Sequence, residues 1–168
     1  DGYRKEPYPN EERKLIASNK VATHDLAPEM KAKEIADEII MAIKKGEHNF
    51  ILANLANMDI VGHTGKMKET IAAAETIDSN LGRIIKEVEG SDYVLIITAD
   101  HGNAEKMFDP KINQPYTAHT GNKVPFIIMK KNLKLDVKGS LCDIAPTILQ
   151  IMGIVKPKAM TGVSLIGG

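Results

Sequence analysis

The run YVLIITA at residues 93–99 constrains the fold more than any other feature of the chain. It is continuously apolar and rich in β-branched residues, which is typical of a strand buried on both faces of a sheet. The run VPFIIMK at 124–130 has the same character, and NFILANLA at 49–56 has the length of a third buried strand. Residues 1–27 are polar and predict a loop, with one short strand around 20–23.

Helical patterns lie between these runs. The segment 28–46 predicts a helix, with Pro28 at its first position and Gly46 at its end. Its apolar residues Ile35, Ile39 and Ile43 recur every four positions, as on one face of a helix. This alternation of helices and strands predicts an α/β fold with a largely parallel central sheet flanked by helices.

Two further helices complete the pattern. The segment from about 66 to 90 predicts a long helix, and CDIAPTILQIMGI at 142–154 predicts a shorter one. Asp143 is placed to cap the shorter helix, with Pro146 in its first turn and Gly153 at its end. The apolar face of the long helix is predicted from Met67, Ile71, Ala74, Leu81, Ile85 and Val88.

The bulk properties narrow the classes of function. With 168 residues the chain can form one ordinary domain, and its formal net charge of +0 gives no electrostatic reason to bind nucleic acid or an anionic membrane. No apolar run approaches the roughly 20 residues of a membrane span. Cys142 is the only cysteine, which excludes an internal disulfide framework and a thiolate zinc cluster. We expect a protein of the cytoplasm.

Acidic and histidine side chains gather at the predicted strand boundaries. Asp59 and His63, in MDIVGHTG, follow the run 49–56, and Asp100 and His101, in TADHGN, follow the run 93–99. His119, in TAHTGN, precedes the run 124–130. Ligands of open α/β sheets bind outside the carboxyl ends of the strands, so these side chains are expected at one edge. Imidazole and carboxylate ligands suit Mn, Zn, Fe or Mg.

A less specific interpretation stays open beside the metal site. One Asp-x-x-x-His pair alone is more often a surface ion pair than a pair of ligands. Three such elements, holding three of the five histidines, favour a metal site more strongly. The five candidates suffice for one complete site and part of a second in a two-metal arrangement. Of the other histidines, we expect His24 to be a hydrogen-bonded loop residue and His48 to be solvated.

The sequence lacks the motifs of other common nucleotide-binding and catalytic sites. The sequence has no phosphate-binding loop of the G-x-x-x-x-G-K-[ST] type, no G-x-G-x-x-G and no G-x-S-x-G elbow. No serine is placed as a nucleophile beside the histidines. The only arginines are Arg4, Arg13 and Arg83, too few for a dense phosphate-binding cluster.

Four stretches together resemble a known family. SNKVATHDLAPEM, NLANMDIVGHTG, IITADHGNAEKM and TAHTGNKVPFI look like the C-terminal part of the 2,3-bisphosphoglycerate-independent phosphoglycerate mutases, of the alkaline phosphatase superfamily. The resemblance covers essentially the whole chain. His24, Asn19 and Met58 depart from the family pattern, which usually has Tyr, Pro and Pro there, and none of these changes removes a ligand.

The resemblance implies a function and a ligand set. The family interconverts 3-phosphoglycerate and 2-phosphoglycerate in glycolysis and gluconeogenesis through a phosphoserine intermediate, with two divalent metal ions, usually Mn, and without 2,3-bisphosphoglycerate as a cofactor. Carried over, Asp59, His63 and His119 match the ligands of one metal, and Asp100 and His101 match those of the second. The serine nucleophile, the substrate-binding arginines and a catalytic lysine have no counterpart in this sequence.

We therefore expect residues 1–168 to be the C-terminal segment of a metal-binding phosphatase-type domain. The chain would carry most of the metal ligands, no catalytic nucleophile and no identified substrate-binding residue, and it would be inactive alone. The full-length enzyme would be a monomer acting on a small phosphoglycerate. The alternatives are a non-catalytic metal-binding module of the same fold, and a related phosphopentomutase or phosphohydrolase.

Overall fold

The computed structural model describes residues 6–167, and its contacts divide the chain into two compact units. The first unit holds the described residues up to Tyr93 together with His101–Lys123. The second holds Val94–Asp100 and the described residues from Val124 onward. None of the helices among residues 6–167 is both long enough and apolar enough to cross a membrane.

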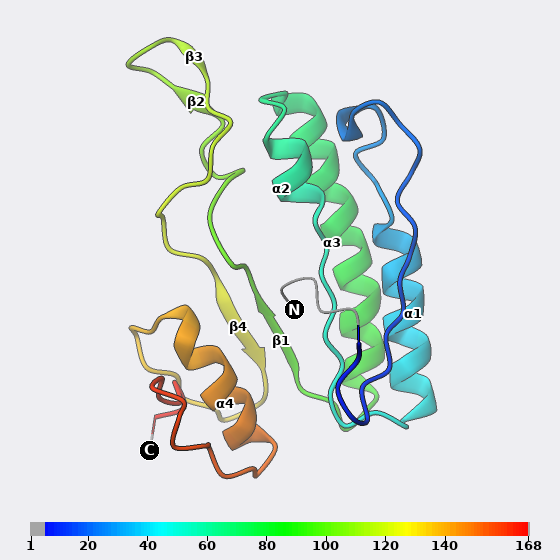
Figure 1. The fold of residues 1–168 in the computed structure, drawn as a ribbon, viewed down its shortest axis with the longest axis vertical. Helices are drawn as coiled ribbons and strands as arrows, with labels where there is room; N and C mark the ends of the chain where they lie inside the picture. The colour runs from blue at the N-terminus through cyan, green and yellow to red at the C-terminus, as the bar shows by residue number, and fades with distance from the viewer. Residues whose placement is uncertain (1–5, 168) are drawn as a thin grey trace. The chain divides into compact units, whose positions relative to one another are not determined.

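Two long helices form the centre of the first unit. Helix α1 spans Ala32–Lys45 and helix α3 spans Met67–Glu89, and the two pack side by side (Figure 1). Three alanines of the two helices, Ala32, Ala36 and Ala73, are fully buried, and such small side chains allow helix backbones to approach closely. A short 3-10 helix, η1 (His24–Leu26), precedes α1 and contacts α3.

The observed helix α1 begins later than its sequence indicates. Residues 29–31 form turns, and Ala32 is the first helical residue, so the prediction of Pro28 at the first helical position is wrong. The predicted end is confirmed: Gly46 adopts φ = 66°, and its N–H donates to the carbonyl of Ala42. A left-handed residue at this position suits glycine, which has no Cβ to clash.

The buried face of α3 is not the predicted one. Its buried residues include Ala73, Ile84 and Val88, whereas Met67 and Ile71 are half-exposed. The helix has apolar residues on more than one face, and packing against α1, α2 and η1 selects which of them are buried. Among the predicted residues, Val88 alone belongs to the fully buried set of α3.

The run 49–56 forms no strand within the described residues, so that prediction is wrong. Residues 50–55 are irregular, with Leu52 83% exposed, and helix α2 (Asn57–Gly62) follows them. A strand requires a neighbouring strand to complete its hydrogen bonds, and no described segment pairs with this one. The short strand expected around 20–23 is likewise absent from the described residues.

The second unit holds the two strands predicted most clearly. Strand β1 (Leu95–Thr98) pairs with β4 (Phe126–Met129), with Leu95 opposite Met129 and Thr98 opposite Phe126. Helix α4 (Ile144–Ile151) follows a 3-10 turn, η2 (Leu141–Asp143), and Gly153 lies just beyond it at φ = 70°.

The α/β class is confirmed, but the strand pairings are antiparallel instead of the expected parallel. This holds for β1 with β4 and for the small hairpin of β2 (Phe108–Asp109) and β3 (Gln114–Pro115) in the first unit. The apolar pattern of a strand reports its burial and not the direction of its partner.

Asp143 stands at the predicted N-cap position of α4, but its side chain makes no capping hydrogen bond to that helix. Its carboxylate accepts from the backbone N–H and the hydroxyl of Ser140, and from the backbone N–H of Val163. These bonds, that of Val163 foremost, lower the pKa of Asp143. The predicted capping role is therefore refined, because Asp143 closes the η2 turn and holds the C-terminal segment.

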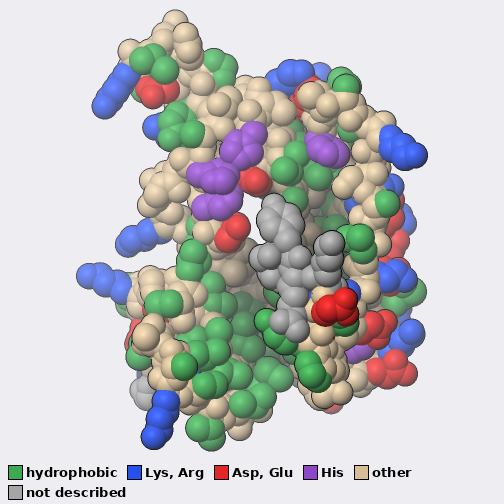
Figure 2. All heavy atoms as spheres, in the orientation of Figure 1, with side chains coloured by type: hydrophobic (Ala, Val, Ile, Leu, Met, Phe, Trp, Pro, Cys, Tyr) green, Lys and Arg blue, Asp and Glu red, His purple; other side chains and the backbone are tan. Residues whose placement is uncertain are grey.

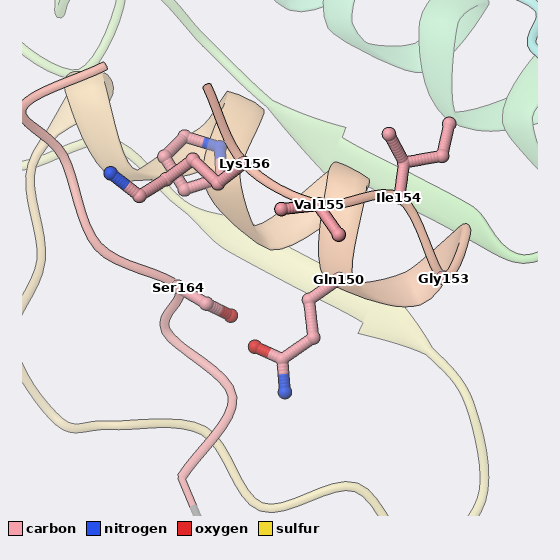
Figure 3. Close-up of a pocket in the computed structure, with 7 residues that line it drawn as sticks. Gln150, Gly153, Ile154, Val155, Lys156 and Ser164 are labelled. Atoms are coloured by element: carbon pink, nitrogen blue, oxygen red, sulfur yellow. The ribbon is translucent and has the colours of Figure 1, made fainter. Parts of the chain in front are cut away.

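An open pocket of about 390 Å³ lies beside the end of α4 (Figure 3). Its lining includes Gln150, Gly153, Ile154, Val155, Lys156 and Ser164. None of the five predicted metal ligands lines it.

Candidate metal centre

Helix α2 carries two of the predicted ligands. Asp59 lies in its first turn and His63 is the residue that ends it, with the His63 N–H donating to the carbonyl of Asp59 at 3.0 Å. A spacing of four places both side chains on one side of a helix. The sequence predicted these two residues at the end of a strand, whereas the structure places them on a helix. The helix still brings the two side chains together.

Two polar contacts, each with one buried side chain, help to hold α2 and the turn after it in place. Asn57 is 1% exposed, and its amide donates to the carbonyls of Pro28 and Glu29, at 2.9 Å each. Beyond the turn, Lys66 Nζ lies 2.5 Å from the buried carboxylate of Asp25. The bond from Lys66 lowers the pKa of Asp25, and the same contact raises the pKa of Lys66. The turn that bears His63 is thereby anchored on both sides.

The other two histidines of the cluster come from neighbouring loops. The segments that carry His101 and His119 are joined by an antiparallel bridge between Gly102 and Thr120. In this bridge the Thr120 N–H donates to the Gly102 carbonyl at 2.8 Å. The rings of His101 and His119 stack with their centroids 3.6 Å apart.

The three histidine side chains converge on one carboxylate oxygen of Asp59. Asp59 Oδ1 lies 3.1 Å from His119 Nε2, 3.2 Å from His63 Nε2 and 3.9 Å from His101 Nε2. The Nε2 atoms of His63 and His119 are 2.9 Å apart. Figure 2 shows histidine side chains gathered together on the surface.

One hydrogen bond assigns the tautomer of His63. Its Nδ1 lies 2.6 Å from the carbonyl oxygen of Thr117, which can only accept, so Nδ1 carries the proton. In neutral His63 the lone pair is then on Nε2, the atom that faces the cluster. A backbone carbonyl that holds the outer nitrogen of a histidine is a usual feature of metal-ligating imidazoles.

Glu105 ties the two histidine loops together. Its Oε1 accepts from the Thr120 hydroxyl and, at 2.9 Å, from the amide of Asn122. The bond from Thr120, assisted by that from Asn122, holds the pKa of Glu105 below its usual range. Glu105 thus stays ionised and keeps the loop of His119 beside the loop of His101.

The glycines of the three motifs serve different purposes. Of Gly62, Gly65, Gly102 and Gly121, Gly65 alone has a left-handed backbone, at φ = 69°. Gly62 and Gly102 instead provide space, because a Cβ on either would fall 2.5 Å from an oxygen of Asn103 or Glu105 respectively. A Cβ on Gly121 would meet no described atom within 4 Å.

The donor set fits a divalent cation. Asp59, His101 and His119 each offer one ligand atom, and these atoms lie within 4.8 Å of one another. His63 Nε2 adds a fourth donor beside them. Imidazole nitrogens and a carboxylate oxygen suit Mn, Fe, Co or Zn, and a bound cation would relieve the repulsion between facing nitrogen lone pairs.

The predicted ligands fall in both units of the chain. Asp59, His63, His101 and His119 meet in the first unit, whereas Asp100 belongs to the second. The division of the five residues between two metals stays a prediction.

Neither remaining histidine joins the cluster. His24 lies in η1, and its Nδ1 is buried with no hydrogen-bond partner among residues 6–167, which differs from the expected hydrogen-bonded loop residue. His48 Nε2 lies 3.6 Å from Glu12 Oε2, so its side chain is partnered as well as partly solvated.

Sequence reasoning missed three supporting residues. Thr117, Asn103 and Glu105 all lie within four residues of a predicted ligand in the sequence. For Asn103 and Glu105, that proximity combined with a side chain able to form hydrogen bonds was the available signal, whereas Thr117 acts through its backbone carbonyl and gave none. Their partners could not be assigned, because the contacts join positions as much as 54 residues apart.

The chain is similar in sequence to known proteins that are about three times as long. The chain is 52% identical over 167 residues to a 2,3-bisphosphoglycerate-independent phosphoglycerate mutase of Ehrlichia canis, a match that covers 99% of this chain and 33% of that protein. A similarly named protein of Methanosarcina barkeri is 48% identical, with 99% and 32% covered. The chain therefore spans about a third of the length of these relatives.

A solved structure shows the same fold. A crystal structure of Leishmania mexicana phosphoglycerate mutase at low cobalt concentration matches with a TM-score of 0.83 and 30% identity, and the match covers 92% of this chain and 31% of that one. The family description that fits the sequence, over residues 1–156, is that of the metalloenzyme superfamily. With the histidine and carboxylate donors that the structure brings together, this match shows that the chain belongs to the metalloenzyme superfamily.

Proposed function

We propose that this chain is the metal-binding part of a phosphoglycerate mutase that does not require 2,3-bisphosphoglycerate. The full enzyme would interconvert 3-phosphoglycerate and 2-phosphoglycerate through a phosphoserine. The observation that carries the proposal is the convergence of Asp59, His63, His101 and His119 in a chain similar over 99% of its length to proteins of that name.

The proposed centre holds two divalent ions, with Mn²⁺ as the preferred metal. Asp59, His63 and His119 would bind one ion, and Asp100 and His101 would contribute to the other. In such centres the metal neutralises charge on a phosphoryl group and lowers the pKa of a coordinated hydroxyl.

The residues of this chain act by holding the ligand atoms in place. The Thr117 carbonyl keeps the proton of His63 on Nδ1, so that Nε2 stays available. Glu105 holds the segment of His119 against that of His101 through Thr120. Preorganised ligands of this kind reduce the cost of ordering when a metal binds.

Residues 1–168 supply no nucleophile in this proposal. The serine and the substrate-binding arginines would come from the two thirds of the mutases that the chain does not match. We accordingly propose that residues 1–168 form a segment of a larger phosphatase-type domain, within a monomeric cytoplasmic enzyme of glycolysis and gluconeogenesis.

The test separates metal binding from catalysis. Equilibrium dialysis with Mn²⁺, followed by metal analysis, should find metal bound to the chain, and an enolase-coupled assay should find no mutase activity. Robust mutase turnover by these 168 residues would overturn the assignment of the nucleophile elsewhere. A lack of Mn²⁺, Co²⁺ and Zn²⁺ binding by a folded chain would overturn the metal centre.

Single substitutions test the division of the ligands. Asp59→Ala and His63→Ala should weaken one class of metal site, whereas Asp100→Ala should weaken the other. Equal loss of every bound ion from each of the three variants would contradict the division.

A further inference from the structure

Asn103 makes the most direct contact with a candidate ligand from outside the predicted set. Its side chain is almost fully buried, with 5% of the residue exposed. The amide Nδ2 donates to Asp59 Oδ1 at 2.9 Å and lies 3.4 Å from the Asp59 backbone carbonyl. The oxygen it contacts is the same one that faces the three imidazoles.

The orientation of this amide follows from the chemistry of its partners. The ionised carboxylate and the carbonyl of Asp59 can only accept, so the NH₂ group of Asn103 must face them. Its Oδ1 then points the other way and is buried with no hydrogen-bond partner among the described residues. A buried acceptor left without a partner costs stability, so the retained orientation reflects the bond to Asp59.

Gly62 provides the space that Asn103 occupies. A Cβ built on Gly62 would lie 2.5 Å from Asn103 Oδ1 and 3.2 Å from its Cγ, and its three nearest atoms would all belong to Asn103. Gly62 is the last residue of α2 and has no left-handed backbone. The absence of a side chain at Gly62 is therefore explained by Asn103 and not by the backbone conformation.

We propose that Asn103 is a positioning residue that orients the Asp59 carboxylate for metal binding, with Gly62 making room for it. The bond to Nδ2 fixes the rotation of the carboxylate and directs Oδ1 toward His63 and His119. The inference rests on the metal-binding function proposed above, and it adds a residue pair whose two members can be altered separately.

A double-mutant cycle tests the pair. Mn²⁺ affinity is measured by calorimetry for the wild-type chain, Asn103→Ala, Gly62→Ala and the double variant, with circular dichroism to verify folding. Loss of an outer partner typically weakens metal binding about 10- to 100-fold, and we expect this for Asn103→Ala. Gly62→Ala should also weaken binding, because its methyl group displaces Asn103. The double variant should bind no more weakly than Asn103→Ala alone.

The matched control is Asn49→Ala. Asn49 is exposed, and the described part of the chain offers its side chain no hydrogen bond, so Mn²⁺ affinity should not change.

A second measurement, by NMR spectroscopy, needs no metal. In the ¹⁵N-labelled protein, the side-chain amide protons of Asn103 should exchange slowly with solvent, and they should exchange faster in Asp59→Ala.

The outcomes separate this inference from the proposed function. Wild-type binding that Asn103→Ala leaves unchanged overturns the positioning role and leaves the metal centre standing. An effect of Gly62→Ala that is equally large with and without Asn103 overturns the role of Gly62. If the folded wild-type chain binds no metal, the proposed function fails, and the amide exchange rates still decide whether Asn103 holds Asp59.

Discussion

The helix pair α1–α3 and the cluster around Asp59 are stabilised in different ways, although they belong to the same unit. The helices are held by packing, with Ala32, Ala36 and Ala73 fully buried. The cluster is half-exposed: the side-chain exposures of Asp59, His63, His101 and His119 are 34%, 39%, 28% and 49%. Its geometry depends on a few directional hydrogen bonds from loops.

This difference indicates that stability and metal binding can be altered separately. Apolar burial contributes to the free energy of unfolding in proportion to the area removed from water. Hydrogen bonds at an exposed site contribute little net stability, yet they fix the positions of ligand atoms. Substitutions in the helices should therefore change unfolding, and substitutions in the loops should change metal affinity.

The largest expected effect is on the helix pair. Ile84 is 2% exposed in α3, so Ile84→Ala should lower the free energy of unfolding by about 2–5 kcal/mol through lost burial and a cavity. Urea denaturation followed by circular dichroism measures this. The control is Ile71→Ala on the same helix, where the side chain is half-exposed. An equal loss from both variants would contradict the assignment of the buried face.

The second effect is on the cluster alone. Asp59→Ala removes the oxygen that the three imidazoles face. Loss of a residue that only supports a ligand weakens metal binding by up to about 100-fold, so loss of the ligand Asp59 should weaken Mn²⁺ binding by at least about that factor. The helical circular dichroism signal should stay unchanged. Asp78→Ala, an exposed acid on α3, serves as the control in the same titration. Comparable losses from the two substitutions would indicate nonspecific attraction of the cation by negative charge.

A smaller effect is expected at Glu105, whose hydrogen bonds contribute to stability and also hold the two histidine loops of the cluster together. Glu105→Ala removes the acceptor for Thr120 and Asn122 and should cost about 1 kcal/mol of stability, because the side chain is exposed. Glu105→Gln keeps a carbonyl acceptor and should cost less.

The pH dependence of this contribution has a definite sign. The pKa of Glu105 is lowered in the folded state, so its contribution is fully present above the ordinary value of 4.5. It is lost as the pH falls through the lower folded-state pKa. Urea midpoints measured between pH 6 and pH 3 should therefore converge for wild type and Glu105→Gln in acid. A difference that grows toward low pH would contradict this role.

The smallest effects come from a pair of matched glycine substitutions. A Cβ on Gly82, within α3, would meet no described atom within 4 Å, so Gly82→Ala should stabilise the protein by about 0.5–1 kcal/mol. A Cβ on Gly102 would lie 2.5 Å from Glu105 Oε1 and closer still to Thr120 Oγ1. Gly102→Ala should therefore lower the thermal midpoint and weaken Mn²⁺ binding. Equal responses to the two substitutions would indicate that the loop geometry is not constrained by Glu105.

The elements that could be predicted from sequence are those fixed by local patterns. The long helix α3, the end of α1 at Gly46 and the strands β1 and β4 follow from periodicity, from a left-handed glycine and from apolar runs. Asp59 and His63 were recognised as a pair because their spacing is local. The strand expected at 49–56 failed because strands depend on partners, and no described segment supplies one.

The sequence by itself determined which residue types the site can use, because the imidazoles and carboxylates stand in short motifs that can be read directly. Tertiary structure alone decided their arrangement. The bond of Asn103 to Asp59 spans 44 positions, and that of His63 to Thr117 spans 54. Contacts over such separations leave no periodic pattern in the chain, because they form only when loops are brought together by the packing of other elements.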